Sequence, residues 1–228
     1  MYREPYFDFI DDELTDKYDF YNYNNAVEIL ANAFPNEWWE LCDCLKKLEI
    51  SVEDLREAGG NETNIPKKFD DILYPHGWRE IRMTGDLHLK YYPRRANQRG
   101  RFEDVPYDEK IIEGYIDGHN IDFLKGSVAF DLEWNSKDQT FDRDIMAMRT
   151  FYECGVIRVG VIVTRSKELD NVFKTIKDSS GQSIKRKYGA STTWIGKLIP
   201  RLDSRRNGGC PILAVAIREK CITDWNEE

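Results

Sequence analysis

The sequence predicts an α/β fold in which a mixed central β-sheet is flanked by helices on both faces. Three observations support this prediction. A helical period covers residues 21–60, residues 127–135 alternate between apolar and polar side chains, and residues 156–164 are almost entirely apolar. Alternation is typical of a half-buried strand, whereas a short apolar run is typical of a central strand covered on both faces.

The expected helices follow from apolar residues spaced three and four positions apart. Such spacing begins after Tyr21, is interrupted at Pro35 and resumes at Trp38. A short third helix opens at Ser51 and stops at the glycine pair 59–60. Later helices are expected at residues 141–154, 169–176 and 194–202.

The expected strands lie in the second part of the chain, separated by polar loops. A basic loop at residues 94–101 and a polar loop at 179–193 interrupt them. The strands are expected near Trp78 and at residues 85–92, 114–125, 127–135, 156–164 and 211–218.

With 228 residues, 41% of them hydrophobic, the chain is long enough for one large domain with a full core. We expect residues 1–228 to form a single domain. Residues 1–20 are predicted to be a loosely tethered acidic arm, residues 21–60 a helical part, and residues 78–218 the α/β core. No apolar run is long enough to span a bilayer, and no secretory signal or Cys-x-x-Cys pair is present, so we expect a cytoplasmic protein without a membrane partner.

The charge is distributed unevenly. Residues 1–60 hold 15 acidic and 5 basic residues, so the rest of the chain carries +2 of the net charge of −8. Two basic runs stand out, and each is either a solvated loop or a surface for a polyanion. They comprise Lys90, Arg94, Arg95, Arg99 and Arg101, and then Lys185, Arg186, Lys187, Lys197, Arg201, Arg205 and Arg206.

Three carboxylates are expected to meet on one hairpin. The Gly-Ser pair 126–127 favours a two-residue turn, which would place Asp122 opposite Asp131 and on the same face as Glu133. Opposed like charges destabilise a sheet unless a divalent cation or a raised pKa relieves them, and oxygen ligands suit Mg²⁺ or Mn²⁺. The alternative is a solvent-facing strand whose acids pair with lysines.

The order Asp122, eight intervening residues, then Asp131-Leu132-Glu133 resembles the PD-(D/E)xK nuclease motif in a variant without the final lysine. It is most similar to the type II restriction endonucleases of the BglII and BstYI group, with an acid at the last place as in BamHI. The resemblance extends over residues 21–165 and implies a restriction-endonuclease-like fold. Several relatives have glutamate and glutamine where this chain has Asp131 and Glu133.

The resemblance implies Mg²⁺-dependent hydrolysis of double-stranded DNA at a short palindromic site by a homodimer, with Mn²⁺ as a substitute cofactor. Asp122, Asp131 and the carbonyl group of Leu132 would hold the metal. Glu133 would act as a base or as a further metal ligand. Glu80 and Asp86 are additional acids that could join the site.

Base-reading and interface residues are also implied by the resemblance. Helix 141–154 would form the dimer interface, although its pattern is equally typical of core packing. Residues expected at the DNA are Asn135, Ser136, Lys137, Ser191, Thr192, Thr193, Arg201, Arg205, Arg206 and Asn207, most of the basic ones at phosphates. Two other functions remain open: a structure-specific repair or junction nuclease of the same fold, and a DNA-binding relative that does not cleave.

Overall fold

The computed structural model describes residues 4–56, 64–92 and 107–225. They fall into two compact units: one comprises residues up to 80 and from 121 onward, and the other comprises Ile81–Asn120. None of the described helices is both long enough and apolar enough to cross a lipid bilayer.

The sheet has six strands in the order β1-β6-β5-β4-β3-β2. Strands β4, β5 and β6 are parallel, whereas β1 and β3 run antiparallel to their neighbours β6 and β4. The prediction of a mixed sheet is therefore confirmed. The strands are β1 (Tyr18–Tyr23), β2 (Arg79–Tyr91), β3 (Asp108–Lys125), β4 (Val128–Glu133), β5 (Val159–Arg165) and β6 (Ile212–Ile217).

The helices occupy the connections between these strands. Pro35 occupies the first turn of a helix, where the missing N–H costs nothing, and so it starts α3 directly after α2 ends. The α-helices are α1 (Asp12–Lys17), α2 (Ala26–Ala33), α3 (Pro35–Lys47), α4 (Val52–Arg56), α5 (Asn64–Leu73), α6 (Thr140–Glu153), α7 (Leu169–Thr175) and α8 (Ile195–Asp203). Short 3₁₀ turns are η1 (Pro5–Phe9), η2 (Tyr74–His76), η3 (Ile184–Lys187) and η4 (Glu219–Cys221).

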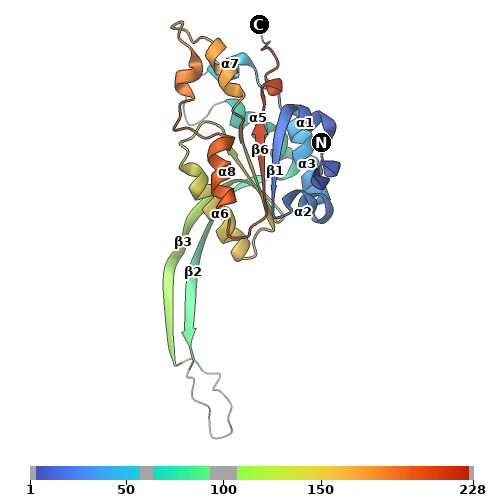
Figure 1. The fold of residues 1–228 in the computed structure, drawn as a ribbon. Coiled ribbons are helices and arrows are strands. Elements are labelled where there is room, and N and C mark those ends of the chain that lie inside the picture. Colours follow the sequence, from blue (N-terminus) through green and yellow to red (C-terminus); the bar gives the residue numbers. More distant parts are fainter. Residues whose placement is uncertain (1–3, 57–63, 93–106, 226–228) are drawn as a thin grey trace. The chain divides into compact units, whose positions relative to one another are not determined.

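Helices cover both faces of the central strands, as predicted. On one face Phe130 and Val161 belong to a continuous buried cluster with Trp38 of α3 and Phe69 of α5. On the other face Gly160 has no side chain, and a Cβ there would overlap the sulfur of Met148 from α6. In Figure 1, α6 and α8 lie on one side of these strands, and α1, α2 and α3 lie on the other.

The N-terminal segment differs from the predicted loose arm. Leu14 and Tyr18 are fully buried, and the hydroxyl of Tyr18 donates to the carbonyl of Leu45 at 2.8 Å. Residues 18–23 then pair along their whole length with β6 and so form an edge strand of the sheet. Burial of apolar side chains and a complete backbone ladder hold residues 10–23 in the fold.

Helix α5, which contains Pro66, is not predicted by the sequence analysis. The proline lies in the first turn of the helix, where it is tolerated. Ile65, Phe69 and Leu73 are buried at intervals of four residues, which gives the helix one apolar face.

Residues 81–120 form the second unit, a hairpin of the long strands β2 and β3. The two strands predicted near Trp78 and at 85–92 are one strand, and β3 begins at Asp108, before the predicted start at 114. Inside this unit Asp86 accepts a hydrogen bond from the Gly114 N–H, and His88 Nε2 lies 2.9 Å from Glu109 Oε2. The basic loop 94–101 lies outside the described residues.

Glu40 joins three elements near the turn of the β3–β4 hairpin. Its carboxylate accepts hydrogen bonds from the indole N–H of Trp78 (2.8 Å) and from Nζ of Lys125 (2.5 Å). We expect Glu40→Ala to lower the free energy of unfolding by about 2 kcal/mol, because it leaves a buried donor and a cation unpaired. Urea denaturation measures this; Glu49→Ala, at an exposed position, is the control, and equal losses in both variants would contradict the prediction.

Candidate active site

The β3–β4 hairpin brings Asp122 and Asp131 together. Lys125 pairs with Val128 and Phe123 with Phe130, which is the predicted register. Only the first turn residue, Gly126, has a positive φ (55°), as a type II′ turn requires. Asp122 and Asp131 follow as the next opposed pair of this register.

At this pair the carboxylates replace the backbone ladder. The N–H of Asp122 donates to Oδ1 of Asp131 at 2.9 Å, and the N–H of Leu132 donates to Oδ2 of Asp122 at 2.9 Å. Each aspartate thus orients the other strand's backbone, and both side chains are fixed relative to the hairpin. Charge-assisted hydrogen bonds of this kind are among the stronger ones in proteins.

The two acids of β4 are buried, whereas Asp122 on β3 is exposed, so the alternative of a solvent-facing strand does not hold for β4. Asp131 is 3% exposed and Glu133 is 5% exposed. Burial, and then the charge of Asp122, raises the pKa of Asp131 well above its usual value. Desolvation by the surrounding protein, with added negative charge from Glu133 and Glu80, raises the pKa of Asp122 to about 6, although the Leu132 N–H opposes this.

Helix α6 supplies the remaining partners of Glu133. The hydroxyl of Thr140 donates to Oε2 of Glu133 at 2.9 Å, and a guanidinium nitrogen of Arg143 lies 3.6 Å from Oε1. Thr164, its neighbour on β5, donates to the Glu133 carbonyl at 2.6 Å. Glu133 is therefore held at both its side chain and its backbone.

Asp122, Asp131 and Glu133 form the acidic cluster, and Asp144 of α6 is a fourth acid beside it that was not predicted. It is 2% exposed, and Arg143 donates two hydrogen bonds to its Oδ1. Burial, and then the charges of Glu133 and Asp131, raises the pKa of Asp144 to about 9. Asp144 thus binds its proton more tightly than an ordinary aspartate does.

The donor set suits a hard divalent cation in charge and in atom type. Oδ2 of Asp131 and Oδ2 of Asp144 are buried, and neither finds a hydrogen-bond partner within the described part of the chain. Carboxylate oxygens are the ligands that Mg²⁺ prefers, and a cation would relieve the repulsion that raises these pKa values. As placed, the described His, Cys, Asp and Glu side chains do not gather in threes around one point.

The comparison with protein families decides the class of this site. The family described as restriction endonuclease BglII/BglIII matches residues 18–217, which include the whole acidic cluster. The chain belongs to the BglII family of restriction endonucleases. It is a type II restriction enzyme that acts on DNA, which makes it a site-specific deoxyribonuclease and a hydrolase. The resemblance and the restriction-endonuclease-like fold predicted from the sequence are thereby confirmed. A comparison with curated proteins gives no match.

In this BglII-family enzyme, two segments predicted to read bases lie side by side just beyond β4. Lys137 forms an antiparallel bridge with Thr192. The N–H of Thr193 donates to the Ser136 carbonyl (2.8 Å), and the N–H of Asp138 donates to the Ser191 carbonyl (2.9 Å). Lys137 and Ser191 are exposed, whereas Thr193 is fully buried. The amide of Asn135 donates to the Lys187 carbonyl over a long distance, 3.5 Å.

The predicted arginines of the basic tail, residues 185–207, lie on α8 and in the turn that follows it. Arg201 binds Asp142 with two hydrogen bonds (3.0 and 2.9 Å), and Arg206 donates to the same carboxylate at 2.5 Å. Arg205 is exposed and has a positive φ of 58°. Asn207 is 2% exposed, and its amide donates to the Cys210 carbonyl, which is a structural role.

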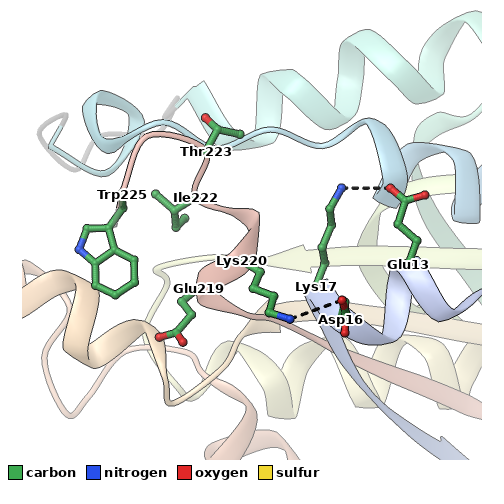
Figure 2. A pocket seen from close by; sticks show the side chains of 8 residues that line it. All are labelled: Glu13, Asp16, Lys17, Glu219, Lys220, Ile222, Thr223 and Trp225. Carbon is green, nitrogen blue, oxygen red and sulfur yellow. Dashed lines mark hydrogen bonds and ion pairs between the residues drawn. The ribbon is translucent and has the colours of Figure 1, made fainter. Parts of the chain in front are cut away.

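A separate pocket of about 500 Å³ lies beside the C-terminal 3₁₀ turn η4 (Figure 2). Lys17 pairs with Glu13, and Lys220 pairs with Asp16. The indole of Trp225, which also lines this pocket, donates to Thr175. Its charged groups therefore compensate one another, and none of its lining residues belongs to the acidic cluster.

Proposed function

We propose that this enzyme cleaves double-stranded DNA at a short palindromic site, with Mg²⁺ as cofactor and Mn²⁺ as a substitute, at the acidic cluster of Asp122, Asp131 and Glu133. The observation that supports the proposal is the gathering of these carboxylates, with Asp131 and Glu133 buried and Oδ2 of Asp131 without a hydrogen-bond partner among the described residues, next to the two predicted DNA-reading segments. Buried carboxylates without compensation are costly for stability, and such sites are commonly functional.

Asp122 and Asp131 hold the cation in this proposal, with the carbonyl of Leu132 as a further ligand. When bound, the cation neutralises charge at the scissile phosphate and acidifies water. Glu133 either completes the ligand set or orients and deprotonates the attacking water. Thr140 and Arg143 hold Glu133 in place, so Glu133 needs little reorganisation during the reaction.

We also propose that the enzyme acts as a homodimer and that both compact units serve one nuclease domain. A palindromic site has two-fold symmetry, which a two-fold dimer matches. Helix α6 remains the proposed interface. Its inner residues, such as Phe141 and Met148, are buried in the subunit, while Met146 is 53% exposed on the outer face and is available to a partner.

Digestion of a plasmid of known sequence tests the function. With Mg²⁺ we expect discrete fragments whose mapped ends fall at one sequence with two-fold symmetry. Ends that follow junctions or damage would indicate a structure-specific nuclease. Binding without any cut would indicate a non-cleaving relative, and either result would overturn the proposal.

The tail arginines are proposed to contact DNA phosphates. We expect Arg205→Ala to weaken DNA binding at every sequence and to reduce the slope of log K against log salt by about one. Fluorescence anisotropy at several salt concentrations measures this. Arg201→Ala should act in the same direction, with its folding checked separately because Arg201 also binds Asp142. Unchanged slopes in both variants would place the tail away from the DNA.

A further inference from the structure

Arg165 is a buried cation at the end of β5. Its neighbour Thr164 pairs with Glu133 in the parallel register, so Arg165 lies at the strand ends where the acidic cluster is found. The residue is 2% exposed. Burial lowers its pKa to about 10, which leaves it charged at neutral pH.

The partners of Arg165 do not compensate its charge fully. One guanidinium nitrogen donates to the hydroxyl of Thr192 at 2.5 Å, and another lies 3.5 Å from Asp170. Lys185 pairs with that same carboxylate of Asp170. Nε of Arg165 is buried and finds no hydrogen-bond acceptor in the residues that the structure describes. An incompletely paired buried charge costs stability, so stability alone does not explain this arginine.

The loop that Arg165 holds has little packing on one side. Gly189 and Ala190 border a cavity of about 390 Å³, which Arg165, Lys185 and Trp194 also line. The hydroxyl of Thr192 both accepts from Arg165 and donates to the Gly189 carbonyl at 2.8 Å. Hydrogen bonds centred on Thr192 therefore fix this part of the loop.

We propose that Arg165 is a positioning residue for sequence discrimination. Through Thr192 it fixes the recognition loop, residues 189–193, to the ends of the central strands β4 and β5, where Glu133 lies. The inference rests on the proposed function, in which this loop and Lys137 read the DNA. Because the bridge between Thr192 and Lys137 joins the two reading segments, the position of Thr192 sets both.

An arginine suits this task better than a lysine. Its guanidinium lies 5.6 Å from the ring centres of both Phe173 and Tyr188, and those two rings stack at 3.8 Å. A planar, delocalised cation can contact aromatic faces while it donates a directed hydrogen bond from its edge. A lysine keeps the charge but loses this fixed geometry.

The test compares cleavage of the cognate duplex with cleavage of duplexes that carry one changed base pair. In Arg165→Lys and Thr192→Val we expect the ratio of kcat/KM for cognate over altered sites to fall by about tenfold, the scale of one lost base contact. Thr192→Ser keeps the hydroxyl and should retain the wild-type ratio. Arg158→Lys, at an exposed position before β5, is the matched control and should not change it.

Three other outcomes would contradict the inference, the coupling through Thr192 or the proposed function. If the variants lose thermal stability and cleave all duplexes more slowly by the same factor, so that the ratio stays constant, Arg165 is structural only and this inference is overturned. If Arg165→Lys and Thr192→Val reduce the ratio independently of each other, so that the double variant loses the product, coupling through Thr192 is overturned. If instead the wild-type enzyme shows no discrimination, the proposed function itself fails.

Discussion

Asp131→Ala is expected to abolish DNA cleavage while DNA binding survives. Asp131 and Asp122 are the proposed cation ligands, and the loss of several kcal/mol of charge stabilisation corresponds to at least about a thousandfold in rate. Removing a negative charge beside a phosphate leaves binding intact or strengthens it. Asp122→Ala should behave in the same way, because it removes the opposed member of the pair.

Cleavage of a labelled duplex and its binding measured by anisotropy separate the two effects. Asp16→Ala is the control, because Asp16 is an exposed aspartate on α1 paired with Lys220. Circular dichroism checks that the hairpin variants fold, since both aspartates accept backbone hydrogen bonds. Wild-type cleavage rates in both variants would rule out the assignment of these residues.

Removing divalent cations is expected both to stop cleavage and to lower the melting temperature of the protein. A cation that binds only the folded chain stabilises it by about 2.7 kcal/mol at a hundredfold excess over its Kd, or roughly 5–10 °C for a chain of this size. The mutual repulsion among Asp122, Asp131 and Glu133, which raises the pKa values of both aspartates, is the reason to expect a sizeable effect.

Thermal melts in EDTA and in Mg²⁺ measure this difference. Asp131→Asn keeps the shape of the side chain but removes its charge, so its melting temperature should respond much less to Mg²⁺. A similar Mg²⁺ response in wild type and Asp131→Asn would mean that the cation binds somewhere else. A wild-type enzyme that cuts at full rate in EDTA would contradict the metal-dependent mechanism.

The parts of the fold set by local pattern could be predicted from the sequence. The Gly-Ser turn and strict alternation of β4 specify one register, because a slip of one residue would bury the wrong face. Helix α6 and strand β5 follow from their periods and were placed to within a few residues. Strand β1 could not be predicted, because its pairing with β6 joins residues almost 200 positions apart.

The candidate site was predicted only in the part that lies on one hairpin. Asp144 is not predicted, because the three- and four-residue spacing of Phe141, Ile145 and Met148 indicates only that the helix has a buried apolar face. Asp144 lies within that same buried stripe. Because acids are rarely buried without a reason, its position in the pattern is the feature of the sequence that could have revealed it. The link from Arg165 to Thr192 depends on tertiary contact and leaves no local pattern.

The position of β1 at the edge of the sheet has a consequence for shortened versions of the protein. A chain that begins after Tyr23 would uncover one side of β6, whose six residues are all apolar and buried. Such an unprotected, uncharged strand readily pairs with strands from other molecules. Truncation there should therefore yield insoluble material, however remote the deleted segment is from the chemistry.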